Sequence, residues 1–130
     1  MAQISTGVQT GVDAPITLAV ETVIATLTGV TTPRRTDVQI EGWAQITPGT
    51  ATTAVTLRIR RGVDITGTLI GEGNPGTVVG AVGVTEDHYL KVRDVGADLF
   101  AATYVLTAQQ TAGTGNGTAV QTSMNASWPE

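Results

Sequence analysis

The sequence has 130 residues, which suits a single domain with a sizeable core. Hydrophobic residues make up 41% of the chain and charged residues only 14%, and the net charge of −4 argues against a nucleic-acid-binding surface, which needs a basic excess. The absence of cysteine excludes a disulfide framework and a thiol nucleophile, and no apolar run is long enough for a transmembrane helix.

Residues 1–15 form a polar, glycine-punctuated stretch, which predicts an N-terminal arm or edge strand ahead of a domain at 16–130. From Ile16 the chain alternates between apolar and polar residues, but the phase changes near Glu21. A one-residue change of phase indicates a bulge or a bend. We therefore expect a kinked stretch of strand whose inward side chains are Ile16, Leu18, Val20, Val23, Ala25 and Leu27.

The clearest strand pattern covers residues 37–47. Trp43 lies on its polar face, and the opposite face carries Val38, Ile40, Gly42, Ala44 and Ile46. Residues 54–61 alternate in the same way, with Val55, Leu57 and Ile59 on one face. The glycines that follow predict a turn at 61–64 and a short strand at 68–70.

The last third of the chain predicts three further strands. Residues 89–93 form a short alternating strand, followed by a loop at 94–98. Residues 100–110 and 118–128 flank the run AGTGNG, whose Asn116-Gly117 pair is typical of a type I′ hairpin turn. The final strand is expected to place Val120, Met124 and Ala126 on one face.

Short strands at close spacing, together with 24 threonines and no helical period, predict an all-β fold. Each strand has one apolar face, and such faces are buried when two sheets pack together. We expect an antiparallel two-sheet, jelly-roll-like β-sandwich with no significant helix.

Two short motifs could carry chemistry, and neither is complete. Residues 71–76 match G-x-G-x-x-G, but the dinucleotide motif needs a helix at its last glycine, and here Pro75 precedes a valine-rich strand. Residues 86–88 join two carboxylates to the only histidine, yet no second histidine or cysteine can complete a metal site and no nucleophile motif accompanies it. We predict no enzyme, no catalytic residue, no metal site and no cofactor.

Five side chains are candidates for contacts with a partner: Trp43, Arg58, Arg60, Tyr89 and Trp128. An indole on a polar face, like that of Trp43, is expected to be covered by a subunit, a partner, a ligand or a loop of the same chain. In a recognition module, Trp43, Tyr89 or Trp128 would be the stacking platform for a sugar. The two arginines are expected to pair across strands with Asp37 or Glu41 rather than to capture an anion.

Residues 99–129 contain no charged side chain. Monomeric β-proteins usually rely on charge to protect their edge strands and to stay apart from one another. A long uncharged β-region therefore favours burial in a homo-oligomer or a larger assembly.

Three groups of residues carry a family resemblance: Gly42-Trp43-Ala44; Arg60-Arg61-Gly62 with Gly67-Thr68; and Tyr104–Thr107 leading to Gly115–Thr118. Across Val20–Trp128 the chain resembles small bacteriophage and virus structural proteins with a single jelly roll. These are similar to the tumour-necrosis-factor and complement-C1q type of trimeric β-sandwich. No catalytic motif accompanies the resemblance.

The resemblance implies a homotrimeric virion protein, either a capsid decoration protein that stabilises the head or a fibre module. Its partners would be copies of itself and the major capsid protein or another virion protein. The N-terminus lacks the basic start and apolar run of a signal peptide, so we expect assembly in the host cytoplasm and a final place in the virion. The alternative hypothesis is a carbohydrate- or receptor-binding module of a phage tail or spike, with a host-surface glycan as its ligand.

Overall fold

The computed structural model describes residues 2–5, 9–49, 53–73, 77–79, 84–113 and 115–129. None of these residues is helical, and most belong to strands. The strands are β1 (Ala2–Ser5), β2 (Gln9–Ile16), β3 (Thr22–Val30), β4 (Thr36–Thr47), β5 (Thr53–Arg61), β6 (Thr68–Glu72), β7 (Thr77–Val79), β8 (Glu86–Ala97), β9 (Ala102–Ala112) and β10 (Gly117–Trp128). The prediction of an all-β fold is confirmed for this part of the chain.

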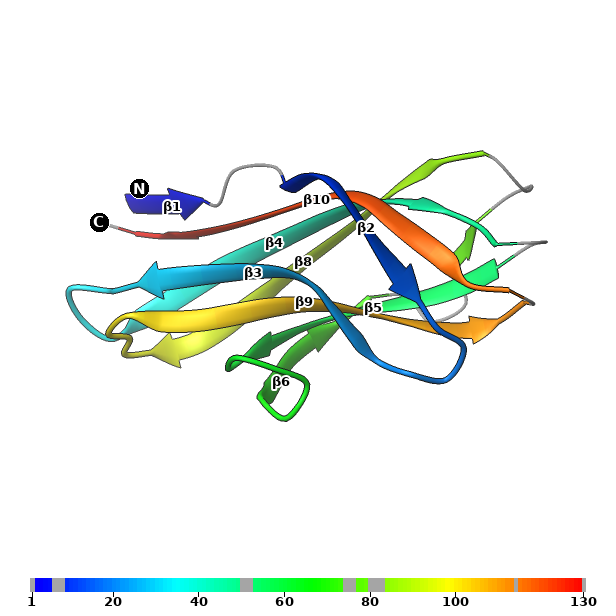
Figure 1. The fold of residues 1–130 in the computed structure, drawn as a ribbon. Helices are drawn as coiled ribbons and strands as arrows, with labels where there is room; N and C mark the ends of the chain where they lie inside the picture. Colours follow the sequence, from blue (N-terminus) through cyan, green and yellow to red (C-terminus); the bar gives the residue numbers. More distant parts are fainter. Residues whose placement is uncertain are drawn as a thin grey trace.

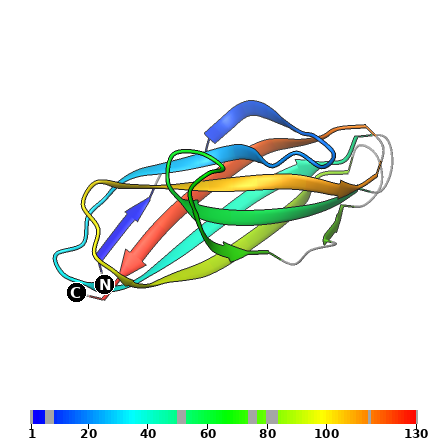
Figure 2. The ribbon, with the colours of Figure 1, turned by 90° about the horizontal axis from the view of Figure 1, so that it is seen from below.

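The strands form two antiparallel sheets packed face to face (Figure 1, Figure 2). In sheet A, β10 and β4 are central, β8 is an edge, and β1 and β2 pair in turn along the other side of β10. In sheet B, β9 and β5 are central, β3 is an edge, and β6 and β7 share the other side of β5. Each sheet is therefore four strand positions wide.

The chain alternates between the sheets as it proceeds. Strands β2, β4, β8 and β10 lie in sheet A, whereas β3, β5 and β9 lie in sheet B. This alternation gives the strand order of a jelly roll, in which most successive strands face each other across the core. Strands β5 and β6 are an exception, because they form a hairpin within sheet B. The predicted two-sheet sandwich is thus confirmed, and most of its connections cross between the layers.

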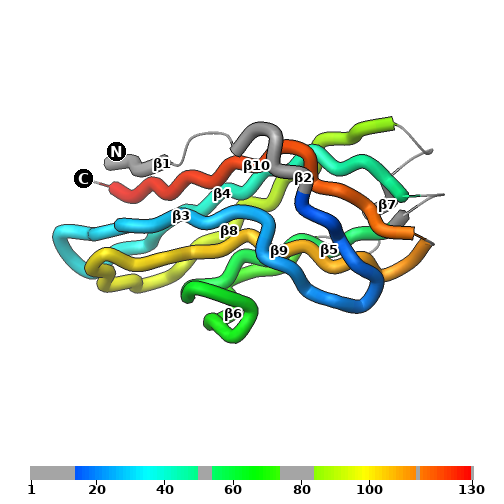
Figure 3. Tube along the Cα trace, viewed as in Figure 1, coloured from blue at the N-terminus to red at the C-terminus, as the bar shows by residue number. Residues whose placement is uncertain are grey.

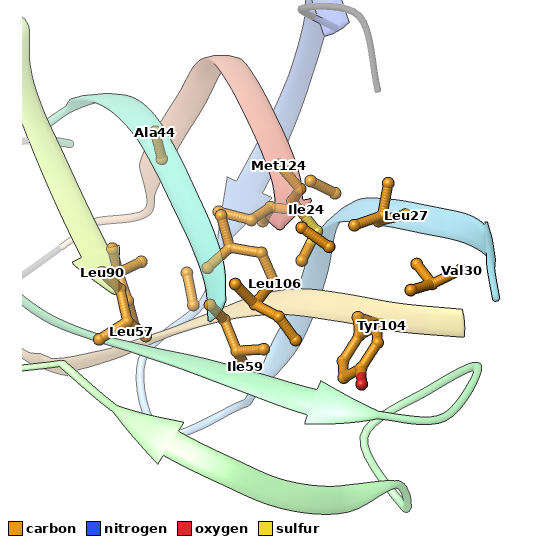
Figure 4. Close-up of a cluster of buried hydrophobic side chains, with 14 of the residues drawn as sticks. Ile24, Leu27, Val30, Ala44, Leu57, Ile59, Leu90, Tyr104, Leu106 and Met124 are labelled. Carbon is orange, nitrogen blue, oxygen red and sulfur yellow. The ribbon is translucent and has the colours of Figure 1, made fainter. Parts of the chain in front are cut away.

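The core fills the space between the sheets (Figure 4). Strand β4 has the predicted alternation, because Val38, Ile40, Ala44 and Ile46 are all fully buried. Gly42 lies on the same face, where a Cβ would come within 2.8 Å of Leu106 Cδ1. Glycine at this position therefore lets a leucine of sheet B pack directly on the backbone of sheet A.

The predicted kinked stretch from residue 16 is instead two strands in different sheets. Strand β2 ends at Ile16 in sheet A, and β3 begins at Thr22 in sheet B (Figure 3). In the crossing between them Leu18 and Val20 are 48% and 50% exposed, so they are not the inward residues that the alternation suggested. The change of phase marked a change of sheet, which neighbouring side chains alone could not distinguish from a bulge.

The predicted hairpin between the last two strands is wrong. Strand β9 belongs to sheet B and β10 to sheet A, so the connection is an arch across the sandwich. The glycines with left-handed backbone are Gly113 (φ 103°) and Gly115 (φ 73°), rather than the Asn116-Gly117 pair. A bulge between Ala119 and Gln121 then reverses the phase, so that Ala119 is buried and Val120 is only half-buried.

Strand β8 is longer than predicted. It continues through the expected loop at 94–98 as far as Ala97, and Asp94 faces the interior at 6% exposure. The Tyr104 hydroxyl donates a hydrogen bond to Asp94 Oδ2 at 2.7 Å, and Arg61 Nη1 contacts the same oxygen at 2.6 Å. Asp94, which the sequence pattern placed in a loop, therefore links β8 of sheet A to β5 and β9 of sheet B.

Candidate functional site

The outer face of sheet A carries the aromatic residues Trp43 and Tyr89. Because the even-numbered residues of β4 fill the core, Trp43 must point outward. Its register partners are Tyr89 on β8 and Ser123 on β10. Tyr89 is 73% exposed, whereas Trp43 is half-buried. The structure therefore brings together two of the five predicted contact residues.

A hollow of about 310 Å³ lies at this aromatic pair. Its lining residues are Glu41, Gly42, Trp43, Tyr89, Ser123 and Asn125, and it is called the Trp43 hollow below. Strand β10 contributes small polar side chains where β4 and β8 contribute aromatic rings. The difference in side-chain size across neighbouring strands leaves the surface concave.

One ion pair borders the Trp43 hollow. Lys91 Nζ lies 3.4 Å from Glu41 Oε1, and the two side chains are 61% and 43% exposed. Exposed pairs of this kind contribute little to stability. The Glu41 carboxylate therefore keeps its capacity to accept hydrogen bonds from a ligand.

A second hollow, of about 230 Å³, continues along the same strands. Gln39 on β4 is in register with Arg93 on β8 and with Ser127 on β10, and all three residues line it. Trp128 also lines this hollow but is only 5% exposed and belongs to the hydrophobic core. The indole of Trp128 is therefore too buried to stack on a sugar ring, in contrast to the prediction for this residue.

Arg58 and Arg60 lie on the outer face of sheet B, in an ionic network. Arg60 donates to both carboxylate oxygens of Glu21, at 2.7 and 3.0 Å, and Arg58 Nε donates to Glu72 Oε1 at 2.6 Å. The predicted pairing with Asp37 or Glu41 is wrong, because those residues lie in sheet A. The sequence did not identify Glu21 as the partner of Arg60, because Glu21 precedes β3 and lies 39 residues away in the chain.

The network shifts the protonation equilibria of its members. The hydrogen bonds from Arg60 lower the pKa of Glu21, and burial opposes this shift only in part. The same contact raises the pKa of Arg60. The Thr107 hydroxyl also donates to Glu21 Oε2, at 2.7 Å, so this carboxylate connects the crossing after β2 to both β5 and β9.

His88 is placed on the inner side of β8, and its side chain is 10% exposed. Its Nε2 lies 3.9 Å from Glu86 Oε2, too far for a hydrogen bond. Burial lowers the pKa of His88, which favours the neutral imidazole. Among the residues that the structure describes, no three His, Asp or Glu side chains gather as metal ligands.

A third surface feature is apolar and was missed in the sequence. Five side chains between 45% and 76% exposed lie on two segments that flank sheet B, and they are called the apolar rim: Leu18 and Val20 in the crossing between β2 and β3, and Val63, Ile65 and Leu69 on the β5–β6 hairpin. Arg60 joins its two segments, because it binds Glu21 next to Val20 and donates to the Gly67 carbonyl at 3.0 Å. In the sequence, the only indication of this surface was the pair of apolar residues Val63 and Ile65 on either side of Asp64, in a segment that the glycines marked as a turn.

The turn of the apolar rim is held by its own hydrogen bonds. The Thr66 backbone N–H donates to Asp64 Oδ1 at 2.8 Å, and Gly67 N–H donates to the Asp64 carbonyl at 3.1 Å. Gly62 N–H donates across to the Thr103 carbonyl at 2.8 Å. These hydrogen bonds hold the backbone of the β5–β6 hairpin (Figure 1) around Val63 and Ile65.

The fold places the chain among jelly-roll β-sandwiches, an architecture that occurs in viral capsid and lectin domains. In the described ranges, no helix is both long and apolar enough to cross a membrane. No protein-family model matches the sequence, and no curated protein matches it.

Solved virus structures include chains with a similar fold. A chain in the structure of infectious bursal disease virus, Gx strain, is 9% identical with a TM-score of 0.57, over 97% of this chain and 33% of that one. A chain in the structure of the Gt strain is 7% identical with a TM-score of 0.56, over 95% of this chain and 32% of that one. This chain therefore spans about a third of the length of each chain it matches, and the likeness concerns the fold.

Proposed function

We propose that this protein is a structural component of a virion and has no enzymatic activity. The observation that carries the proposal is the jelly-roll likeness to a chain in a virus structure, which extends over 97% of the sequence. In this proposal residues 16–130 are the domain and residues 1–15 its N-terminal edge or arm. The protein acts by adhesion, as a homotrimeric capsid decoration protein or a fibre module, and its other partner is the major capsid protein or another virion protein.

The apolar rim supports self-association. Large apolar side chains that gather on one side of a soluble domain commonly mark a contact surface. The rim carries five of them on two segments that Arg60 links through its bonds to Glu21 and to the Gly67 carbonyl, and the turn around Val63 and Ile65 is held by hydrogen bonds to Asp64. A preorganised surface loses little conformational freedom on association, which favours a stable oligomer.

Two measurements test this proposal. Sedimentation velocity and native mass spectrometry of the purified protein at micromolar concentration should give a trimer, whose obligate interfaces bury more than about 2,000 Å² in total. Cryo-electron microscopy of the native particle should place the domain on the capsid or in a fibre. A stable monomer would contradict the trimer, and a particle without the protein would contradict the virion role.

A second candidate function is recognition of a host-surface glycan or receptor by a tail or spike. The Trp43 hollow favours it, because this hollow combines two aromatic rings with hydroxyl, amide and carboxylate groups. The two functions use different faces of the molecule, since the hollow lies on sheet A and the apolar rim on the side of sheet B. One protein could therefore assemble through one face and bind a ligand through the other.

A further inference from the structure

We infer that the Trp43 hollow binds one ring of an uncharged glycan chain, and that the chain continues along β4 into the hollow at Gln39. This inference rests on the second candidate function and names its ligand class. A pyranose ring has an apolar face of C–H groups and a rim of hydroxyl groups. A matching site therefore needs an aromatic surface for the face and hydrogen-bonding groups for the rim.

Trp43 and Tyr89 provide the aromatic surface. They are register partners on neighbouring strands, so their side chains emerge side by side on the same face. Both rings lie on the outer face of sheet A, away from the core. Trp43 is half-buried there, and Tyr89 is 73% exposed. The partial burial of Trp43 fixes its ring while leaving it accessible from the hollow.

Ser123, Asn125 and Glu41 provide the polar rim. Asn125 is the register partner of Glu41, and Ser123 is the register partner of Trp43. The asparagine amide can donate and accept, the serine hydroxyl can do both, and the carboxylate accepts from two oxygens. Vicinal sugar hydroxyls both donate and accept hydrogen bonds, so they can pair with all three side chains. An apolar ligand would leave these polar side chains without hydrogen-bond partners.

The second hollow indicates a chain rather than a single sugar. Trp43 and Gln39 are four residues apart on β4, a separation of about 13 Å along the strand. Gln39, Asp37 and Arg93 line this continuation with further donors and acceptors. The volume of the Trp43 hollow, about 310 Å³, lies at the lower end of the range for ligand sites, which suits one ring with its neighbours outside.

The charge of the lining favours a neutral ligand. Glu41 is the only ionised side chain among the residues that line the Trp43 hollow, and no cation lines it. An anionic sugar placed there would meet this carboxylate at close range, which is unfavourable, whereas its ion-pair partner Lys91 is not among the lining residues. Sialylated glycans are therefore expected to bind more weakly than neutral ones.

The test measures binding of three probes to the full chain by saturation-transfer NMR and tryptophan fluorescence. Maltotriose and N,N′,N″-triacetylchitotriose are the uncharged chains, and sialyllactose is the anionic one. At least one uncharged probe should bind with millimolar or better affinity. Trp43→Ala should weaken that binding by about tenfold or more, and Ser123→Phe, which fills the hollow without removing the indole, should abolish it.

Phe100→Ala is the matched control, because Phe100 is 88% exposed and lies outside both hollows. It should bind the probe as the unchanged protein does. Binding of no uncharged probe, equal binding by the Ser123→Phe variant, or stronger binding of sialyllactose would each overturn the inference. Native mass spectrometry of the same samples reports the trimer separately, so a failure of assembly is distinguished from a failure of glycan binding.

Discussion

Glu21 is the residue whose charge is most closely tied to the fold. Its pKa in the folded protein is below the ordinary value of 4.5, because Arg60 donates two hydrogen bonds to its ionised form. A lowered pKa means that the ionised carboxylate stabilises the fold at pH values above 4.5. That contribution is lost as the pH falls through the lowered pKa.

We expect Glu21→Gln to lower the free energy of unfolding at pH 7 by about 1–2 kcal/mol, since charged hydrogen bonds are replaced by neutral ones. Urea unfolding of both proteins should also show that the variant loses less stability between pH 5 and pH 3 (about these values) than the unchanged protein. Glu41→Gln is the control, because the Glu41–Lys91 pair is exposed. A similar loss at both glutamates would contradict the special role of Glu21.

Tyr104 also contributes to stability, through a buried hydrogen bond from its hydroxyl group to Asp94. Its ring is fully buried in the core, and its hydroxyl donates to Asp94, a carboxylate only 6% exposed. Burial is the main cause of the raised pKa of Tyr104, so the phenol stays protonated and remains a donor.

Tyr104→Phe should destabilise the protein by about 1.5–3 kcal/mol, because a buried carboxylate loses a hydrogen bond. Thermal or urea unfolding at pH 7 measures the change. Tyr89→Phe removes a hydroxyl from a tyrosine that is 73% exposed, and it should change stability by less than about 0.5 kcal/mol. Equal effects of the two substitutions would show that the bond to Asp94 contributes nothing.

At the scale of elements, the arch between β9 and β10 depends on Gln110. This side chain is fully buried, its Nε2 donates to the Gly115 carbonyl at 2.8 Å, and its Oε1 accepts from the Gly117 N–H at 3.0 Å. One amide thus satisfies two backbone groups at the point where the chain changes sheets. A hairpin would have satisfied them by pairing the two strands.

Gln110→Leu should therefore cost about 1–3 kcal/mol, because the buried Gly117 N–H loses its partner, whereas the Gly115 carbonyl belongs to an exposed residue that water can reach. Asn116→Ala should cost less than about 0.5 kcal/mol, since Asn116 is exposed and its backbone is not left-handed. Urea unfolding compares them. A type I′ hairpin predicts the reverse order, with the larger loss at Asn116.

The elements differ in how well the sequence predicted them. Strand β4 was predicted to within one residue, because one of its faces meets the core along its whole length and the alternation of its side chains reflects this burial. Strand β8 was predicted too short, because Asp94 is polar and yet buried by partners 10 and 33 residues away. Alternation of apolar and polar residues indicates which side chains are buried, but it does not indicate that a polar side chain such as Asp94 is buried with a distant hydrogen-bond partner.

At the scale of the molecule, the uncharged stretch at 99–129 has an explanation within the chain. It contains β9 and β10, which are central strands with a neighbour on each side. Central strands need no charge to protect an edge. The absence of charge therefore no longer argues for an oligomer, and the case for self-association rests on the apolar rim.

Ile65→Asp should weaken self-association, because it places a carboxylate on the fixed turn of the apolar rim. Sedimentation velocity at micromolar concentration should show that the proposed trimer shifts toward monomer in the variant. Phe100→Asp makes the same change at another exposed apolar residue, 88% exposed, and should leave the oligomer intact. Dissociation by Phe100→Asp alone would move the contact surface to the β8–β9 connection.

The sequence by itself determined the fold class and the buried faces of β4 and β5, because alternation of apolar and polar residues is a local consequence of which face is buried. It also determined that Trp43 points away from the core. Only the tertiary structure decided which strands share a sheet, that Glu21 pairs with Arg60, and that Trp43, Tyr89 and Ser123 surround one hollow. These facts depend on contacts between residues far apart in the chain, and no local pattern encodes which distant strand a residue will face.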